Sequence, residues 1–265
     1  MEVTNSTENR TKGHHVLISG PPGHGKSVCA ATASEKSPDE FTDEFTAEQG
    51  GGLTNLDDVL FLNFDRQATA GFADLGIEVP EIDLSTCSGK EIISSTKEAL
   101  KVAKARAIEG VTKTVVVDTI SSLDAVLVAF WKEATANRWD MYNAILTTHM
   151  RFAMALKEIP ANVVVICHAK AINEAEDAQG RARQKAAAGP APASISLDIT
   201  GQARGYWQRN VPLQLPLICR TRGSRVERHL YPSGVEGFEA KSRFKLADKE
   251  PAHLRKLFEK IGKVA

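Results

Sequence analysis

Two kinds of hydrophobic pattern alternate along the first two thirds of the chain. Short continuous apolar runs predict buried strands, at about 14–19, 59–64, 82–84, 114–118 and 162–168. Longer segments with apolar residues every three or four positions predict helices, from a glycine-rich turn to about 35 and at about 69–75, 88–109, 123–136 and 140–158. Strands that alternate with helices form right-handed βαβ units. The pattern therefore predicts an α/β fold with a doubly wound, mainly parallel sheet flanked by helices.

The last third of the chain follows a different pattern. Residues 170–205 are rich in Ala, Gly and Pro, which predicts a long mobile loop. Short strands are predicted at about 215–220, 225–231 and 237–241, and the turn Gly223-Ser224 favours an antiparallel hairpin of the first two. A last helix begins near Pro251, with Leu254, Leu257, Phe258 and Ile261 on one face.

The domain organisation predicted from these elements is simple. We expect one domain over residues 14–265, a flexible arm over 1–13 and an acidic surface insertion over 36–58. The chain has 265 residues, of which 42% are hydrophobic and 25% charged, as is usual for a soluble globular domain. Neither a membrane-spanning apolar run nor a signal-peptide core is present, so we expect a cytoplasmic protein without a membrane partner.

Charge and cysteine content narrow the possible chemistry. The four cysteines are scattered, which favours buried thiols over a disulfide framework or a metal site. Formal net charge is zero, but residues 201–265 carry an excess of Lys and Arg. Such an excess favours a polyanion surface or a head-to-tail contact between subunits, and solvated charged faces are the alternative.

A glycine-rich motif follows the first predicted strand. The stretch Gly20-Pro21-Pro22-Gly23-His24-Gly25-Lys26-Ser27, followed by Val28, matches G-x-x-x-x-G-K-[ST], the phosphate-binding P-loop. Glycines let backbone N–H groups curl around a phosphate without Cβ clashes. Lys26 is expected to reach the β- and γ-phosphates, and Ser27 to offer its hydroxyl to Mg²⁺. The motif predicts nucleotide binding, against the alternative of a chance Gly-rich turn.

Three further polar residues stand where predicted strands end. Asp118 fits the acid that organises Mg²⁺ beside a P-loop, although an acid there can also cap the next turn. Asp65 can orient or deprotonate an attacking water, or lie in an ordinary surface turn. His168 can sense the γ-phosphate or be purely structural. Because ligands bind at the carboxyl ends of parallel strands, we expect these side chains to converge with the P-loop.

In this order, the motifs resemble the RecA-like ATPase core. A P-loop, a strand with an acid, the stretch Val115–Leu123 with Asp118, a strand with a polar sensor and a long loop follow each other as in RecA. More narrowly, the chain resembles the phage RecA-like single-strand annealing ATPases of the Sak-four type. Features of that group are Asp65-Arg66, the stretch Arg138–Tyr142, His168 and Glu239–Arg243.

The chain also departs from RecA. RecA has a glutamate where this chain has Asp65, and a glutamine where it has His168. Counterparts of RecA's N-terminal oligomerisation helix and large C-terminal domain are not found, which puts filament formation by the RecA route in doubt. A phage-encoded protein of this type would work in the cytoplasm of the host cell.

The resemblance implies an active site shared between subunits. RecA and ring helicases carry a basic pair at the spacing of Lys241 and Arg243, which reaches the γ-phosphate of a neighbouring subunit. Alternate residues of a strand point to one side, so both cations could face a neighbour, as an arginine finger does. Two solvated cations are the alternative. A homo-oligomer, ring or filament, is the expected assembly.

The resemblance also implies two DNA-binding loops. The first corresponds to about 131–142, where Arg138, Trp139 and Tyr142 combine a cation with aromatic rings. Both rings could instead pack between helices. The second is the 170–205 loop, in which the cations Arg181, Arg183 and Lys185 can neutralise phosphates.

Together these features predict an ATPase that uses ATP and Mg²⁺ and binds single-stranded DNA, for phage-type recombination by annealing or strand pairing. A single-strand-binding protein is a possible partner. The first alternative is a DNA-binding annealer or loader in which ATP is a structural ligand with little turnover. The second is a P-loop small-molecule kinase, which would leave Lys241 and Arg243 unexplained.

Overall fold

The computed structural model describes residues 13–37, 54–66, 68–69, 71–172, 194–222, 225–235 and 237–262. Within this part of the chain, ten strands form one sheet and two short strands pair separately. The strands are β1 (His15–Gly20), β2 (Thr54–Asn55), β3 (Val59–Asn63), β4 (Ile77–Glu78), β5 (Glu81–Asp83), β6 (Thr114–Asp118), β7 (Asn162–Ile172), β8 (Ser194–Leu197), β9 (Leu213–Arg222), β10 (Arg225–Leu230), β11 (Lys241–Ser242) and β12 (Glu250–Pro251). The α-helices are α1 (Lys26–Ala31), α2 (Gly89–Ile108), α3 (Ile120–Ala134), α4 (Arg138–Lys157), α5 (Gly201–Asn210) and α6 (Leu254–Gly262).

The order of strands in the sheet confirms the predicted α/β fold. Its path runs β12-β10-β9-β1-β7-β6-β3-β5, and the strands from β9 to β5 are parallel to one another. The P-loop strand β1 therefore lies between β7 and β9. Beyond β9 the sheet continues with antiparallel strands from the C-terminal part of the chain. There β10 pairs with β9, and β12 pairs with β10. The predicted hairpin of the two strands on either side of 223–224 is thus confirmed.

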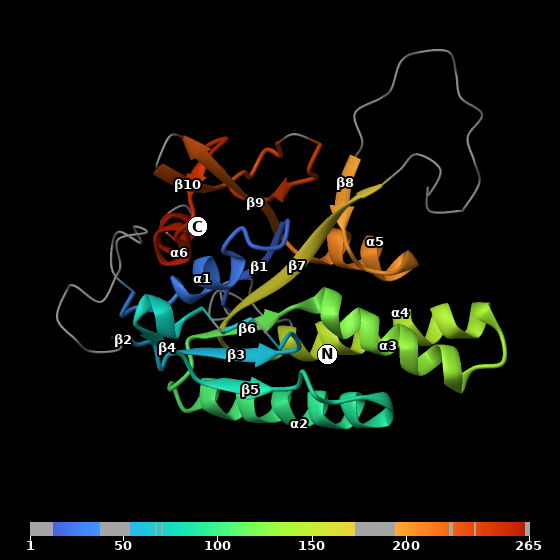
Figure 1. The fold of residues 1–265 in the computed structure, drawn as a ribbon. Helices are drawn as coiled ribbons and strands as arrows, with labels where there is room; N and C mark the ends of the chain where they lie inside the picture. Colours follow the sequence, from blue (N-terminus) through green and yellow to red (C-terminus); the bar gives the residue numbers. More distant parts are fainter. Residues whose placement is uncertain are drawn as a thin grey trace, which may run out of the picture.

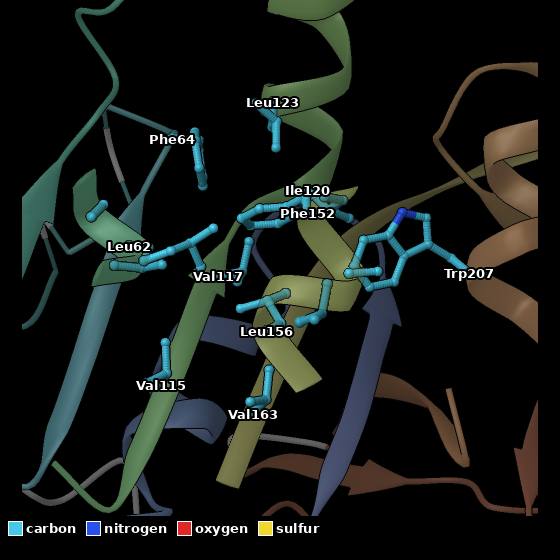
Figure 2. Packing of buried hydrophobic residues seen from close by; sticks show 14 of the residues in the cluster. Leu62, Phe64, Val115, Val117, Ile120, Leu123, Phe152, Leu156, Val163 and Trp207 are labelled. Carbon is cyan, nitrogen blue, oxygen red and sulfur yellow. The ribbon is translucent and has the colours of Figure 1, made fainter. Parts of the chain in front are cut away.

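Both faces of the central sheet are buried, because most positions of β1, β3, β6 and β7 are apolar. In β6, Val115 and Val117 pack toward α2–α5, while Val116 packs toward α1 and α6. Figure 1 shows these two groups of helices on opposite sides of the sheet. On the α2–α5 side, strand residues meet Phe152 and Leu156 of α4 and Trp207 of α5 (Figure 2). The continuous apolar runs of the sequence reflect this two-sided burial.

The helix after the P-loop is shorter than predicted, ending at Ala31 instead of near residue 35. Thr32 explains the early end. Its carbonyl accepts a hydrogen bond from Arg255 N (3.1 Å), and its hydroxyl accepts one from Leu254 N (2.7 Å). The start of α6 therefore occupies the Thr32 carbonyl, which would accept from the N–H of Lys36 if the helix continued. This competition is a tertiary effect that local spacing does not reveal.

The segment predicted as a loop over 170–205 is partly regular. β7 continues to Ile172, β8 pairs antiparallel with the end of β7, and α5 begins at Gly201. Apolar residues account for this regular structure, namely Ile195 and Leu197 of β8 and Ala203 of α5. Leu197 and Ala203 are buried in the core between the sheet and α2–α5. Residues 173–193 lie outside the described part of the chain, as does most of the predicted acidic insertion and the N-terminal arm.

Two further expectations concern the cysteines and membrane-spanning segments. All four cysteines are free thiols, of which Cys29 and Cys167 are buried as predicted and Cys87 and Cys219 are only partly buried. Among the helices that the structure describes, none is both long and apolar enough to cross a membrane.

Candidate active site

The P-loop lies at the end of β1, where its backbone is tightly packed. Gly20 approaches β9 so closely that a Cβ at this position would stand 2.6 Å from the carbonyl oxygen of Leu217. Gly23 and Gly25 have φ angles of +77° and +80°, which L-residues with side chains rarely adopt. The spacing of glycines in the motif therefore follows from one close contact and two left-handed backbone positions.

Lys26 is buried beside the loop that precedes it. Its side chain is 5% exposed, and Nζ donates hydrogen bonds to the carbonyls of Gly20 (3.1 Å) and Pro21 (2.7 Å). Burial lowers the pKa of Lys26 to about 8, which nearby Asp118 and Asp65 partly counteract. The ammonium group is thus held at the mouth of the loop, where a phosphate would replace the carbonyls as its partner.

Asp118 ends β6 and is almost completely buried. Burial raises its pKa to about 6, while a hydrogen bond with the Ser27 side chain and the charge of Lys26 act in the opposite direction. Among the described residues, Asp118 Oδ2 has no hydrogen-bond partner. A buried carboxylate oxygen without a donor, next to a serine hydroxyl, matches the oxygen ligands that Mg²⁺ prefers. The residues predicted for the metal, Ser27 and Asp118, therefore fit it.

Asp65 and His168 approach each other across the same edge. The Asp65 backbone N–H donates to the carbonyl of Asp118 (3.2 Å), which holds the turn after β3 against β6. Asp65 Oδ2 lies 3.8 Å from His168 Nε2. Burial and Lys26 lower the pKa of His168, and Asp65 and Asp198 act to raise it. The pair thus combines a carboxylate two residues after β3 with an imidazole of β7 that lies beside the last residue of β1.

Sheet register explains why these side chains meet. Gly20 pairs with His168 across β1 and β7, and Asn63 pairs with Asp118 across β3 and β6. Gly20, Asn63 and Asp118 end β1, β3 and β6, and His168 lies beside Gly20 within β7, so these positions share one edge of the parallel strands. As predicted, Lys26, Asp65, Asp118 and His168 gather there, and each of the last three interacts electrostatically with Lys26.

Comparison with known proteins identifies the family. The profile described as AAA domain matches residues 12–244, most of the chain. The chain belongs to the AAA domain family. It has a P-loop ATPase fold, with the phosphate loop and the acid-bearing strand placed as that fold requires. A search of curated proteins found no match. Among solved structures, a KaiC-like protein from the hyperthermophilic archaeon Pyrococcus horikoshii is similar, with a TM-score of 0.43 and 15% identity over 91% of this chain and 85% of that chain.

The basic pair of this AAA domain lies away from its own P-loop. Lys241 pairs with Gln214 in β9, which in turn is level with Leu17, three residues before the end of β1. Lys241 Nζ donates to the carbonyls of Gln208 (3.1 Å) and Arg209 (2.7 Å), at the C-terminal end of α5. Arg243 is exposed. The position is compatible with action on a neighbour, but Lys241 has partners within its own chain.

The first DNA loop predicted from the sequence is a helical hairpin. Trp131 lies near the end of α3 and packs against the core. A short turn then leads to Arg138 at the start of α4. Trp139 is 69% exposed, which excludes the packing alternative for that ring. Arg138 donates to the Tyr142 hydroxyl (3.0 Å from Nη2) and stacks over the ring at 5.3 Å. The second set of predicted contacts, Arg181, Arg183 and Lys185, lies outside the described residues.

Two contacts of the site were not predicted from the sequence. The Ser121 hydroxyl accepts a hydrogen bond from His168 N (2.9 Å), linking α3 to the end of β7. The His24 imidazole accepts one from Cys219 N (3.2 Å), linking the P-loop to β9. Ser121 stands three residues after Asp118, which could have suggested its place. The partners of His24 are far apart in sequence, and no local signal marks them.

Proposed function

We propose that this AAA domain hydrolyses ATP with Mg²⁺ and binds single-stranded DNA, for recombination by annealing or strand pairing. The carrying observation is the cluster at the sheet edge, in which Lys26, Asp118, Asp65 and His168 meet. Three of these residues each match one need of phosphoryl transfer: Lys26 is a cation for the phosphates, Asp118 an oxygen ligand for the metal, and Asp65 a base for water.

In this proposal, the roles divide as follows. Lys26 binds the β- and γ-phosphates, and Ser27 and Asp118 would hold Mg²⁺, which would supply positive charge to the phosphate oxygens. Water attacks the γ-phosphorus and the bond to the β–γ bridging oxygen breaks, leaving ADP and phosphate. Asp65 orients the water and accepts its proton. His168, 3.8 Å from Asp65, senses the γ-phosphate.

The proposed DNA contact rests on the exposed side of the α3–α4 hairpin. Trp139 presents its ring to solvent, and Arg138 lies beside it at the start of α4. A cation next to an exposed aromatic ring suits stacking on bases and contact with the backbone of a single strand. The hairpin begins two residues after Asp118, so α3 joins the nucleotide edge directly to this surface. The resemblance to phage annealing ATPases supports the same assignment.

The proposed assembly is a homo-oligomer in which Lys241 and Arg243 reach the γ-phosphate of a neighbour. Arg243 is exposed and can do so directly, whereas Lys241 must first leave the two carbonyls at the end of α5. We therefore expect the arginine to contribute more to turnover than the lysine. A single-strand-binding protein is a further proposed partner.

A second candidate is a DNA-binding annealer in which ATP is a structural ligand. The observation that favours it is Asp65, which is shorter than a glutamate and lies beside His168 instead of projecting freely from the edge. A base held in this way would abstract a proton from water inefficiently. ATP would then stabilise an oligomer that turns over slowly.

Phosphate release from ATP, measured with and without single-stranded DNA, tests these proposals. We expect Lys26→Ala to abolish release, and Trp139→Ala to leave the DNA-free rate unchanged while removing stimulation. Arg243→Ala should leave ATP binding intact and abolish turnover, and mixing it with Asp65→Ala subunits should restore some activity through mixed interfaces.

The controls separate the two candidates. DNA binding that requires ATP, without DNA-stimulated release, would favour the structural role of ATP. If the rate of phosphate release did not change with DNA and the protein did not bind single strands, the DNA proposal would be contradicted. Only the ATPase proposal would then remain. A lower ATP affinity with a normal maximal rate in Arg243→Ala would contradict action in trans.

A further inference from the structure

The β9–β10 hairpin holds the P-loop from the side opposite β7. β9 continues past Leu217, level with Gly20, and runs alongside the loop to Arg222. The bond from Cys219 N to His24 Nδ1 (3.2 Å) joins the hairpin backbone to the middle of the loop. The phosphate loop is thus supported by a segment about 200 residues later in the chain.

Arg228 of β10 reaches the same loop. It pairs with Cys219 in the antiparallel register, so the two side chains share the face of the hairpin that meets the P-loop. A Cβ placed on Gly25 would stand 2.9 Å from Arg228 Nε and 3.2 Å from Cδ. The arginine therefore lies directly against the residue that precedes Lys26. Gly25 is required here both by its φ of +80° and by the arginine beside it.

The position gives the nucleotide site a second cation from the same chain. Lys26 follows Gly25 in the chain, and the Arg228 side chain packs against Gly25. Burial lowers the pKa of the His24 imidazole, and the charges of Lys26 and Arg228 lower it further, so both cations act on this loop. An arginine keeps its charge throughout the physiological pH range. A positive charge several ångströms from a polyphosphate strengthens its binding in proportion to the phosphate charge.

We propose that Arg228 is a positioning residue for the nucleotide polyphosphate, acting through the backbone of Gly25 and through its own charge. The ligand class is a nucleoside di- or triphosphate, with the triphosphate favoured because it carries more charge. This inference rests on the proposed nucleotide binding at the P-loop. It assigns to the C-terminal hairpin a part in the site of its own chain, in addition to the trans role proposed for Arg243.

The test compares two arginines of one hairpin. Arg220 pairs with Glu227 on the opposite face, with its guanidinium 6.0 Å from the Tyr231 ring. Dissociation constants for ATP, ADP and AMP would be measured by calorimetry for the wild type, Arg228→Gln, Arg228→Lys and Arg220→Gln. We expect Arg228→Gln to weaken ATP about tenfold, ADP less and AMP least. Arg228→Lys should recover most of the affinity, and Arg220→Gln should match the wild type.

Ionic strength supplies a readout that a purely structural role would not move. The difference between wild type and Arg228→Gln should shrink at high salt, because the charge is then screened. Equal losses for ATP, ADP and AMP without recovery in Arg228→Lys would overturn the proposal, as would an Arg228→Gln affinity within about twofold of Arg220→Gln. Arg228→Met, which keeps the alkyl stem, takes the place of Arg228→Gln if that variant does not fold. A wild type that fails to bind ATP would instead refute the proposed function.

Discussion

Two groups of polar side chains contain buried atoms, one at the edge of the sheet and one between the helices, and their hydrogen bonds differ. The nucleotide cluster, formed by Lys26, Asp65, Asp118 and His168, contains atoms without a partner. Asp118 Oδ2 and His168 Nδ1 are buried and have no hydrogen-bond partner among the described residues. Buried polar atoms in folded proteins are nearly always paired, so such exceptions call for a ligand or a function.

The helix cluster, formed by Asp124, His149, Thr200 and Trp207, is complete. Asp124 Oδ1 lies 2.8 Å from His149 Nε2, and Oδ2 accepts from the Thr200 N–H (2.8 Å) and hydroxyl (2.6 Å). Trp207 Nε1 donates to His149 Nδ1 (3.2 Å), which makes Nε2 the donor to Asp124. Every group has its partner, and the cluster joins α3, α4 and α5. Incomplete pairing therefore distinguishes the nucleotide cluster from the helix cluster, although single unpaired atoms also occur elsewhere among the described residues, at Thr96, Thr114 and Trp131.

The strongest test of this comparison is Asp118→Asn. We expect turnover of ATP to fall roughly a thousandfold, about 4 kcal/mol in activation free energy, because the metal loses its anionic ligand. Thermal stability should stay level or rise, since burial disfavours the charge that the variant removes. Phosphate release and thermal unfolding of the same preparation measure both effects. A clear drop in melting temperature would show that Asp118 is structural.

The opposite result is expected for Asp124→Ala. Removing this carboxylate leaves the His149 Nε2–H and the Thr200 N–H buried without acceptors, which should cost about 3 kcal/mol in the free energy of unfolding. ATP affinity of the folded variant should remain close to that of the wild type, because the carboxylate does not face the P-loop. Urea unfolding and nucleotide titration provide the two measurements. If Asp124→Ala were no less stable than Asp118→Asn, the distinction between the clusters would be lost.

The smallest expected effect is the dependence of ATP and Mg²⁺ affinity on pH. Binding of Mg²⁺ and ATP needs Asp118 ionised and Lys26 protonated, and their pKa values are about 6 and about 8 in the free protein. Affinity should therefore be highest between these values and fall by up to about tenfold per pH unit on either side. Titrations across this range measure the profile. In Asp118→Asn, the decline on the acid side should disappear while the alkaline side remains.

Stability should follow the same pKa values with definite signs. The raised pKa of Asp118 contributes stability that is present below its usual value and is lost as pH rises through about 6. The lowered pKa of Lys26 contributes stability that is present above its usual value and is lost as pH falls through about 8. Between these values both groups are charged and buried, so the conditions that favour nucleotide binding are those in which the free site is least stable. Binding would relieve this cost.

Much of the nucleotide cluster could be predicted from the sequence, because each member belongs to the P-loop or follows an apolar run directly. In a parallel sheet, the ends of such runs must share one edge, so strand position alone implies proximity. The pairing of Asp65 with His168 could not be predicted, since it depends on the register and on the turn after β3. Trp139 shows the same limit, because the sequence allowed both packing and exposure, and only the structure shows the exposed ring.

The sequence by itself determined the α/β fold, the phosphate loop and the edge of the sheet where the chemistry lies. It could do so because two-sided burial and phosphate binding impose local patterns on a few consecutive residues. Only the tertiary structure decided the length of α1, the regular part of the segment expected as a loop, and the contact of Arg228 with Gly25. Each of these depends on residues far apart in the chain, whose mutual approach leaves no periodicity or motif at either position.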